Sequence, residues 1–295
     1  MAVRFAPSPT GTFHLGNLRT AWISRWWADQ LKMPWIVRFE DIDRPRIVYG
    51  AQEKQLEDMR RLGLIPDGMP LQSKFFGEHF KLFVKAVKEG AVYPCYCSRK
   101  EILDALASAP HSGNPLYTGA CRDLKTAPPY SRPTLAWRFR HLENDPKHDF
   151  IIARSEPPGA DNLPSRDSFV PSYQWACAVD DFQGHYALLV RAWDLFDSAA
   201  QQRSIQKWLE KALGYTSPVT LPAIFHTSLI VSDDLTRLEK RTRRVTLDEV
   251  NANGFSDAQV VEKFRASYHS KVNEFSPGLL FGEEKKQMTL TELGF

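Results

Sequence analysis

The first forty residues alternate between short apolar runs and one longer stretch with helical spacing. Residues 3–6 are typical of a strand, and the proline- and glycine-rich segment 7–11 then forces a rigid turn. From residue 18 to residue 31, apolar side chains recur at helical spacing, and residues 34–40 predict a second strand. Strand, helix and strand within about 40 residues fit one βαβ unit of a doubly wound parallel sheet.

Later segments continue this mixture of periodicities. Apolar spacing predicts helices over residues 52–63, 75–90 and 198–214. Alternating or continuous apolar runs predict strands over residues 134–140, 149–153, 173–181 and 185–191. The sheet is therefore expected to resume at Tyr173 after an interruption, and its buried strand 185–191 ends in Arg191 at the start of a helix.

This order of elements divides the chain into four parts. Residues 1–92 and 168–245 are the two expected halves of a Rossmann-type α/β domain with a doubly wound parallel sheet. Residues 93–167, rich in Pro, Arg, Asp and His towards their end, are expected to form an α+β insertion between those halves. Residues 246–295 are expected to form a short helical C-terminal tail.

Composition places the chain among soluble globular proteins. It is 43% hydrophobic and 25% charged, and its net charge of +3 neither requires nor excludes nucleic acid. No apolar run reaches about 18 residues, and the N-terminus lacks the pattern of a secretory signal, so we expect no membrane partner. Four cysteines are too few for a disulfide scaffold and favour a reducing compartment, so we expect a cytoplasmic protein.

The first turn and the end of the second strand carry candidate chemistry. A helix beginning near Gly16 can hold phosphate at its free N–H groups, and His14 adds a donor there, although a proline-rich connection with an incidental histidine is the alternative. The carboxyl ends of neighbouring parallel strands meet at one rim, which places residues 6–8 beside Glu40. Glu40 could hold an ammonium group or cap a helix, and Arg4 could bind a carboxylate or form a surface ion pair.

Three cysteines form a second cluster. Cys95, Cys97 and Cys121 lie within about 30 residues, which favours zinc in a reducing cell, or else buried small apolar residues. Tetrahedral zinc needs a fourth ligand, and Tyr117, His111 and water are the candidates. Because no reacting group lies nearby in the sequence, a metal here would be structural.

The first stretch resembles class I aminoacyl-tRNA synthetases. Arg4-Phe-Ala-Pro-Ser-Pro-Thr-Gly11 followed by His14-Leu-Gly-Asn17 is similar to the signature of the glutamyl branch. The segment from Arg38 to Asp43 and the cysteine cluster, with a tyrosine four residues before its last cysteine, also resemble that branch. The similarity covers nearly all of this chain but only the catalytic part of a full-length glutamyl enzyme, so it points to a truncated paralogue.

The resemblance implies a site. His14 and Lys240 would be catalytic. Glutamate would be bound by Arg4, Phe5, Ala6, Pro7, Ser8, Glu40, Tyr173 and Arg191. ATP would be bound by His14, Gly16, Asn17, Arg237 and Lys240. Structural zinc would be bound by Cys95, Cys97, Tyr117 and Cys121, within an insertion of the acceptor-binding type.

The resemblance also implies a reaction and its partners. Glutamate would be activated by ATP with Mg²⁺ and then transferred to queuosine in the anticodon stem-loop of tRNA(Asp), by a monomer. Two segments depart from the full-length enzymes: the one after Arg191, and the loop in which Arg237 and Glu239 accompany Lys240. A minimal glutamyl-tRNA synthetase and an inactive zinc-containing RNA-binding paralogue are the alternatives.

Overall fold

The described chain folds into two compact units. The computed structural model describes residues 1–102, 117–141, 145, 148–159, 161–235, 245–269 and 280–295. The first unit comprises Met1–Lys74, Asp181–Ala199 and Thr216–Phe295, and the second comprises Phe75–Asp180 and Ala200–Tyr215. Over the described ranges, no helix is both long enough and apolar enough to cross a bilayer.

The first unit is built on a parallel sheet, as the sequence predicts. Its strands are β1 (Val3–Phe5), β2 (Trp35–Val37), β7 (Leu188–Ala192), β8 (Ala223–Thr227) and β10 (Leu280–Glu283). They lie in the order β10-β8-β7-β1-β2, and every neighbouring pair is parallel. The chain order reverses between β1 and β7, so the carboxyl ends of these two strands form the switch point at which open α/β sheets bind ligands.

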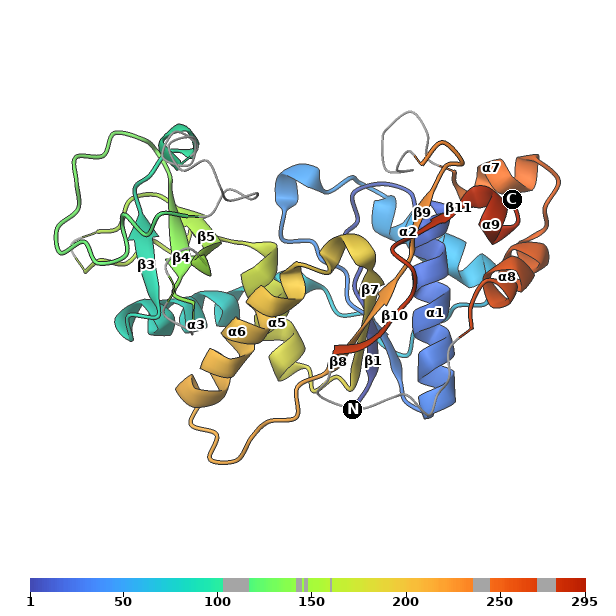
Figure 1. Ribbon diagram of the computed structural model, residues 1–295, viewed down its shortest axis with the longest axis horizontal. Helices are drawn as coiled ribbons and strands as arrows, with labels where there is room; N and C mark the ends of the chain where they lie inside the picture. The colour runs from blue at the N-terminus through green and yellow to red at the C-terminus, as the bar shows by residue number, and fades with distance from the viewer. Residues whose placement is uncertain (103–116, 142–144, 146–147, 160, 236–244, 270–279) are drawn as a thin grey trace. The chain divides into compact units, whose positions relative to one another are not determined.

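Helices and one small strand pair complete this unit. α1 (Leu15–Leu31) runs alongside the sheet (Figure 1), and its inner face joins a core with Leu18, Ile23 and Trp27. The other helices are α2 (Ala51–Arg61), α7 (Leu247–Ala252), α8 (Asp257–Ala266) and α9 (Leu290–Leu293), with the 3₁₀ turns η1 (Arg44–Arg46) and η4 (Trp193–Leu195). Strands β9 (Leu229–Val231) and β11 (Gln287–Thr289) pair with each other.

The second unit is α+β. Its antiparallel sheet contains β3 (Val92–Cys95), β4 (Leu135–Phe139), β5 (Phe150–Ser155) and β6 (Val170–Pro171). The helices of this unit are α3 (Phe76–Lys88) and most of α5 (Tyr173–Gln183) and α6 (Ser198–Ala212), and η2 (Gln72–Phe75) ends at its first residue. Aromatic rings join these helices to the sheet, since Phe83 lies 5.2 Å from Trp137 and Trp208 lies 6.2 Å from Phe139, centroid to centroid.

One expected strand is a helix. Residues 173–181 were expected to resume the sheet, but Tyr173–Gln183 forms α5, and the first unit resumes at Asp181. From Trp175 to Phe182 every residue is buried, so the segment lacks the polar stripe that identifies a surface helix. Its length and its alanines, Ala176 and Ala178, suit a helix better than a buried strand.

The tail is not purely helical, in contrast to the expectation for residues 246–295. After α7 and α8 the chain returns as β10 and pairs with β8, which supplies a partner for the backbone groups on that side of β8. Buried Arg19 of α1 contributes to this return, because its guanidinium lies 2.6 Å from the carboxylate of Glu284 and Nε donates to Ser267 Oγ. An ion pair between α1 and residue 284 has no signature in local periodicity.

Candidate active site

The start of α1 holds His14, Gly16 and Asn17 in one compact cap. His14 is the N-cap residue, and its Nδ1 accepts a hydrogen bond from Gly16 N at 3.1 Å. Asn17 Oδ1 accepts a hydrogen bond from His14 N at 3.2 Å, which closes a capping box. A neutral imidazole that accepts at Nδ1 carries its proton on Nε2, so the side chain can donate to an anion at the helix N-terminus.

Gly16 is required for this cap. A Cβ atom at residue 16 would lie 2.9 Å from His14 Cε1, closer than carbon atoms normally approach. The imidazole can therefore fold over the first turn of the helix only because residue 16 has no side chain.

The loop after β1 is fixed by contacts with the following elements. Glu40 N donates to Pro7 O at 2.9 Å, which joins the ends of β1 and β2 as their parallel pairing predicts. Gln55 of α2 is 2% exposed, and its Nε2 donates to Ser8 O and Gly11 O. Sequence reasoning missed Gln55, which carries no signal beyond a polar residue on the inner face of an amphipathic helix.

Arg4 lies in a buried network of four charged side chains. It is 2% exposed and binds the carboxylate of Asp181 through two nitrogens, with Nε 3.1 Å from Oδ1. Arg38 donates to the same carboxylate at 2.6 Å and to Glu40 at 3.1 Å. The network thus contains two guanidinium groups and two carboxylates. It is buried, whereas the sequence alone suggested a surface ion pair as one alternative for Arg4.

Asp181 is the central member that sequence reasoning did not find. Burial alone would raise the pKa of this carboxyl, but the charges of Arg38 and Arg4 outweigh burial and hold the pKa below its usual value. The pair of aspartates at positions 180 and 181 is the available sequence signal, but the apolar pattern of residues 173–181 predicts that this pair ends a strand. Asp180 belongs to the second unit, where it hydrogen-bonds His79 Nε2 at 2.6 Å.

Arg191 lies at the end of β7, as expected, and faces His226 of β8. The two residues are register partners on parallel strands, and Arg191 Nε donates to His226 Nε2 at 3.1 Å. Both are buried. Sequence reasoning placed Arg191 at the ligand rim but attached no role to His226.

The remaining expected site residues fall elsewhere. Tyr173 is the half-buried first residue of α5 and belongs to the second unit. Arg237 and Lys240 lie outside the described residues, as does His111. Within the first unit, the structure brings the segment Arg4–Ser8, the His14–Asn17 cap, Glu40 and Arg191 to the carboxyl ends of β1, β2 and β7.

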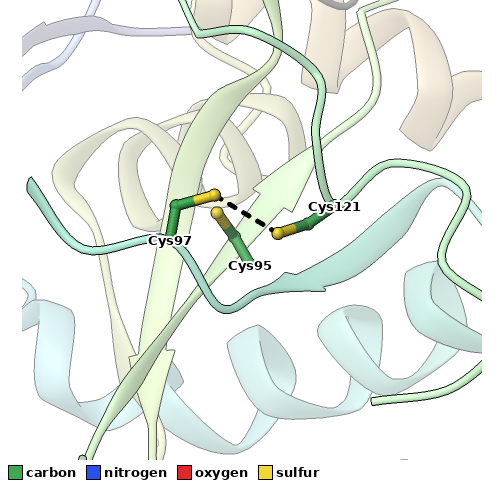
Figure 2. A group of neighbouring side chains, drawn as sticks. All are labelled: Cys95, Cys97 and Cys121. Carbon is green, nitrogen blue, oxygen red and sulfur yellow. Dashed lines mark hydrogen bonds between the residues drawn. The ribbon is translucent and has the colours of Figure 1, made fainter. Parts of the chain in front are cut away.

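The cysteine cluster lies at the end of β3 in the second unit. Figure 2 shows the side chains of Cys95, Cys97 and Cys121 directed towards one another. Their sulfur atoms lie within 4.8 Å of one another, and the Cys97–Cys121 distance is 3.4 Å. Thiolates at the corners of a zinc tetrahedron lie about 3.8 Å apart, because each zinc–sulfur bond is about 2.3 Å. The three sulfurs therefore suit zinc.

Tyr117 and Arg138 surround these sulfurs. Tyr117 Oη accepts from Cys121 N at 2.8 Å and lies 3.7 Å from Cys95 Sγ. Arg138 Nε donates to Cys95 Sγ at 3.3 Å, and its guanidinium carbon lies 3.7 Å from the centre of the Tyr117 ring. Hydrogen bonding from Cys121 and then Arg138 lowers the pKa of Cys95 to about 5. A thiolate beside a guanidinium is a suitable first ligand for a metal.

Comparison with known proteins identifies the family. Residues 1–275 match the family described as tRNA synthetases class I (E and Q), catalytic domain. The chain is 36% identical over 266 residues to the Glutamyl-Q tRNA(Asp) synthetase of Nocardia farcinica, covering 88% of this chain and 82% of that protein. The protein of the same name from Symbiobacterium thermophilum is 37% identical over 278 residues, covering 88% and 83%.

A solved structure has the same fold. The glutamate-tRNA synthetase of Elizabethkingia anophelis superimposes with a TM-score of 0.58 at 23% identity, covering 86% of this chain. This chain spans 54% of that one. With the parallel sheet, its switch point and the capped start of α1, these similarities show that the chain belongs to the class I tRNA synthetases (E and Q), a family of ligases, and to the Glutamyl-Q tRNA(Asp) synthetase group within it.

Proposed function

We propose that this enzyme activates L-glutamate with ATP and transfers the glutamyl group to queuosine in the anticodon stem-loop of tRNA(Asp). The glutamate α-carboxylate attacks the α-phosphorus of ATP, the bond to the bridging oxygen breaks, and pyrophosphate leaves with its electron pair. A hydroxyl group of queuosine then attacks the activated carbonyl and releases AMP. Glutamate is supported by the resemblance of residues 4–17 to the glutamyl branch, and the RNA substrate by the name that the relatives carry.

The single observation that carries the activation step is the cap of α1 beside the switch point. The hydrogen bonds of Gly16 and Asn17 to His14 hold the imidazole over the first turn of α1, where the phosphates of ATP would lie, before substrate binds. Mg²⁺ bound with ATP would neutralise part of the phosphate charge. We assign the same task to Lys240, assisted by Arg237, as pyrophosphate leaves.

The glutamate pocket would use the buried charges at the ends of β1, β2 and β7. Arg4 and Arg191 supply positive charge for carboxylate, and Glu40 supplies negative charge for the ammonium group. Backbone atoms of Phe5, Ala6, Pro7 and Ser8 would line the pocket, and we assign Tyr173 to it on the resemblance alone. Glutamine would be disfavoured because its uncharged amide supplies no negative charge to balance Arg191, whereas Arg4 keeps Asp181 as its partner.

We further propose that the cysteine cluster binds a structural zinc ion. Cys95, Cys97 and Cys121 supply three sulfurs, and the position of Tyr117 Oη beside two of these residues supports the phenol as the fourth ligand. The ion would link β3 to the segment around residue 121 and thereby order the second unit. We expect the enzyme to act as a cytoplasmic monomer.

Labelled glutamate and ATP test the function directly. They would be offered with tRNA(Asp) that contains queuosine, with tRNA(Asp) that lacks it, and with tRNA(Glu). We expect label only on the queuosine-containing tRNA, and glutamate-dependent pyrophosphate exchange without any tRNA. Label on tRNA(Glu) would instead identify a minimal glutamyl-tRNA synthetase. If neither pyrophosphate exchange nor labelling of any tRNA is observed, the result would instead favour an inactive RNA-binding paralogue.

A further inference from the structure

The proposed function gives a role to Arg191 but none to His226, which contacts it. β7 and β8 are parallel neighbours, and Arg191 and His226 occupy the same register position near their carboxyl ends. Arg191 Nε lies 3.1 Å from His226 Nε2, and the two side chains are 3% and 1% exposed. A guanidinium always carries protons on its nitrogens, so the imidazole must be the acceptor.

The acceptor role requires a neutral imidazole with its proton on Nδ1. Burial of His226, and then the positive charge of Arg191, lower the pKa of this histidine to about 3. The lone pair on Nε2 therefore stays available at neutral pH. Because Nε is the one guanidinium nitrogen attached to the side-chain stem, a hydrogen bond there restricts rotation of the whole planar group.

The imidazole is itself held by two aromatic rings from the turn that follows β7. Phe196 lies 5.1 Å from the His226 ring with an interplanar angle of 58°, and Trp193 lies 6.1 Å away at 72°. Trp193 and Phe196 stack on each other at 4.9 Å and 14°. The segment that begins with Arg191 thus also packs against the partner of Arg191, and both ends of the contact are constrained.

We infer that His226 is a positioning residue for the amino-acid pocket: it accepts the Arg191 Nε hydrogen bond and fixes the plane in which Arg191 meets the substrate carboxylate. This inference rests on the proposed function, in which Arg191 binds glutamate. Its physical basis is preorganisation, since a guanidinium held in one orientation loses less conformational freedom when the carboxylate arrives.

Two substitutions at His226 separate the effect of its hydrogen-bond acceptor from the effect of its aromatic ring. His226→Phe keeps a buried ring but removes the acceptor, and His226→Gln restores an oxygen at about the distance of Nε2. In glutamate-dependent pyrophosphate exchange we expect KM for glutamate to rise roughly tenfold to a hundredfold in His226→Phe, because a hydrogen bond to a charged group is lost. KM for ATP should change by less than about threefold. His226→Gln should recover most of the affinity for glutamate.

A double-mutant cycle with Arg191→Ala distinguishes positioning from a general effect on folding. If His226 acts through Arg191, adding His226→Phe to Arg191→Ala should raise KM for glutamate little further. The inference would be overturned if the two substitutions raised KM for glutamate by factors that multiply in the double variant. Equal changes in KM for ATP and for glutamate would also overturn it.

Nitrogen NMR of the full chain tests the contact independently of catalysis. In the wild type, Nε2 of His226 should give the signal of an unprotonated acceptor, and the Arg191 Nε signal should move in His226→Phe but less in His226→Gln. A protonated Nε2, or an Arg191 signal unchanged in both variants, would refute the positioning contact. Loss of glutamate-dependent exchange in the wild type would refute the proposed function instead, so the two failures are distinguishable.

Discussion

Asp181 is the residue on which the buried charges of the first unit depend. Its carboxylate accepts hydrogen bonds from both Arg4 and Arg38, and all three side chains are at most 2% exposed. Removing one partner from a buried ion pair is costly because the remaining charge has neither its partner nor water. The same network orients Arg4 and Glu40, so under the proposed function stability and glutamate binding are coupled at this carboxylate.

We expect Asp181→Asn to lower the free energy of unfolding at neutral pH by about 3–5 kcal/mol, measured by urea denaturation. Asp29→Asn is a matched control, because Asp29 pairs with Arg25 on the surface of α1 and is 53% exposed. That control should change stability by less than about 1 kcal/mol. Equal effects of the two substitutions would contradict a special role for the buried network.

The stability difference should also depend on pH. Arg38 and Arg4 outweigh burial and depress the pKa of Asp181 in the folded protein, so its carboxylate stabilises the fold above its unfolded pKa of about 3.9. This contribution is lost as the pH falls through the folded pKa. The gap between wild type and Asp181→Asn should therefore stay constant from neutral pH to about pH 5 and narrow below about pH 4.

Sequence reasoning found two members of this network and missed its centre for a physical reason. Arg4 lies in the first strand and Glu40 follows the second strand of a recognisable βαβ unit, so their places in that unit single them out. Asp181 is 177 residues from Arg4 in the chain, and no local pattern reports a partner at that separation. His226, likewise, acquires its role only from the strand order that places β8 beside β7.

At the level of elements, α1 combines a helix start with an expected phosphate-binding site. Gly16→Ala tests this combination, because the added Cβ would lie 2.9 Å from His14 Cε1 and must displace the imidazole. We expect pyrophosphate exchange to fall at least about tenfold, with a small change in melting temperature, because alanine is also the better helix former. Steady-state exchange and thermal unfolding are the measurements.

Gly77→Ala is the corresponding control in the first turn of α3. A Cβ there meets only the end of the Arg166 side chain, at 3.4 Å. It should leave exchange unchanged and raise stability by up to about 1 kcal/mol. If Gly16→Ala also leaves exchange unchanged, His14 does not act from the position described.

α2 and α3 were predictable because each has one face in water and periodic apolar positions on the other, and their predicted extents are close to the observed ones. α1 is buried over most of its length, and its extent was predictable from the spacing of its apolar residues and from the proline- and glycine-rich turn before it. The helix α5 was not predicted because it is buried on nearly every side from Trp175 onward, so its sequence shows no helical period of apolar and polar residues. The strand β10 was not predicted because its pairing with β8 depends on the topology of the sheet and not on a pattern in its own residues.

The whole molecule joins a parallel α/β unit to an α+β unit in which the cysteine cluster lies. The first unit contains the residues that we propose contact phosphate and glutamate, apart from Tyr173 and the residues outside the described ranges. Activation of glutamate should therefore depend on the charges of the first unit, and the integrity of the second unit should depend on its metal. These dependences can be separated experimentally, since the cysteines and the buried arginines lie in different units.

Metal content and local stability test this division. We expect the purified wild type to contain about one zinc ion per chain, measured by mass spectrometry of the metal, and Cys121→Ala to lose it, because one of three thiolate ligands is removed. Tyr117→Phe should retain zinc but release it to a chelator more readily, since the phenolate is replaced by water. Cys177→Ala is the matched control: Cys177 is also buried in the second unit but lies in α5 and is not a member of the cluster, so zinc content should not change.

Hydrogen exchange should then accelerate around residues 92–97 and 117–123 in Cys121→Ala, while β1, β7 and β8 keep their protection. Full zinc occupancy in Cys121→Ala would exclude the proposed metal site, and equal acceleration in both units would show that the ion stabilises the entire chain.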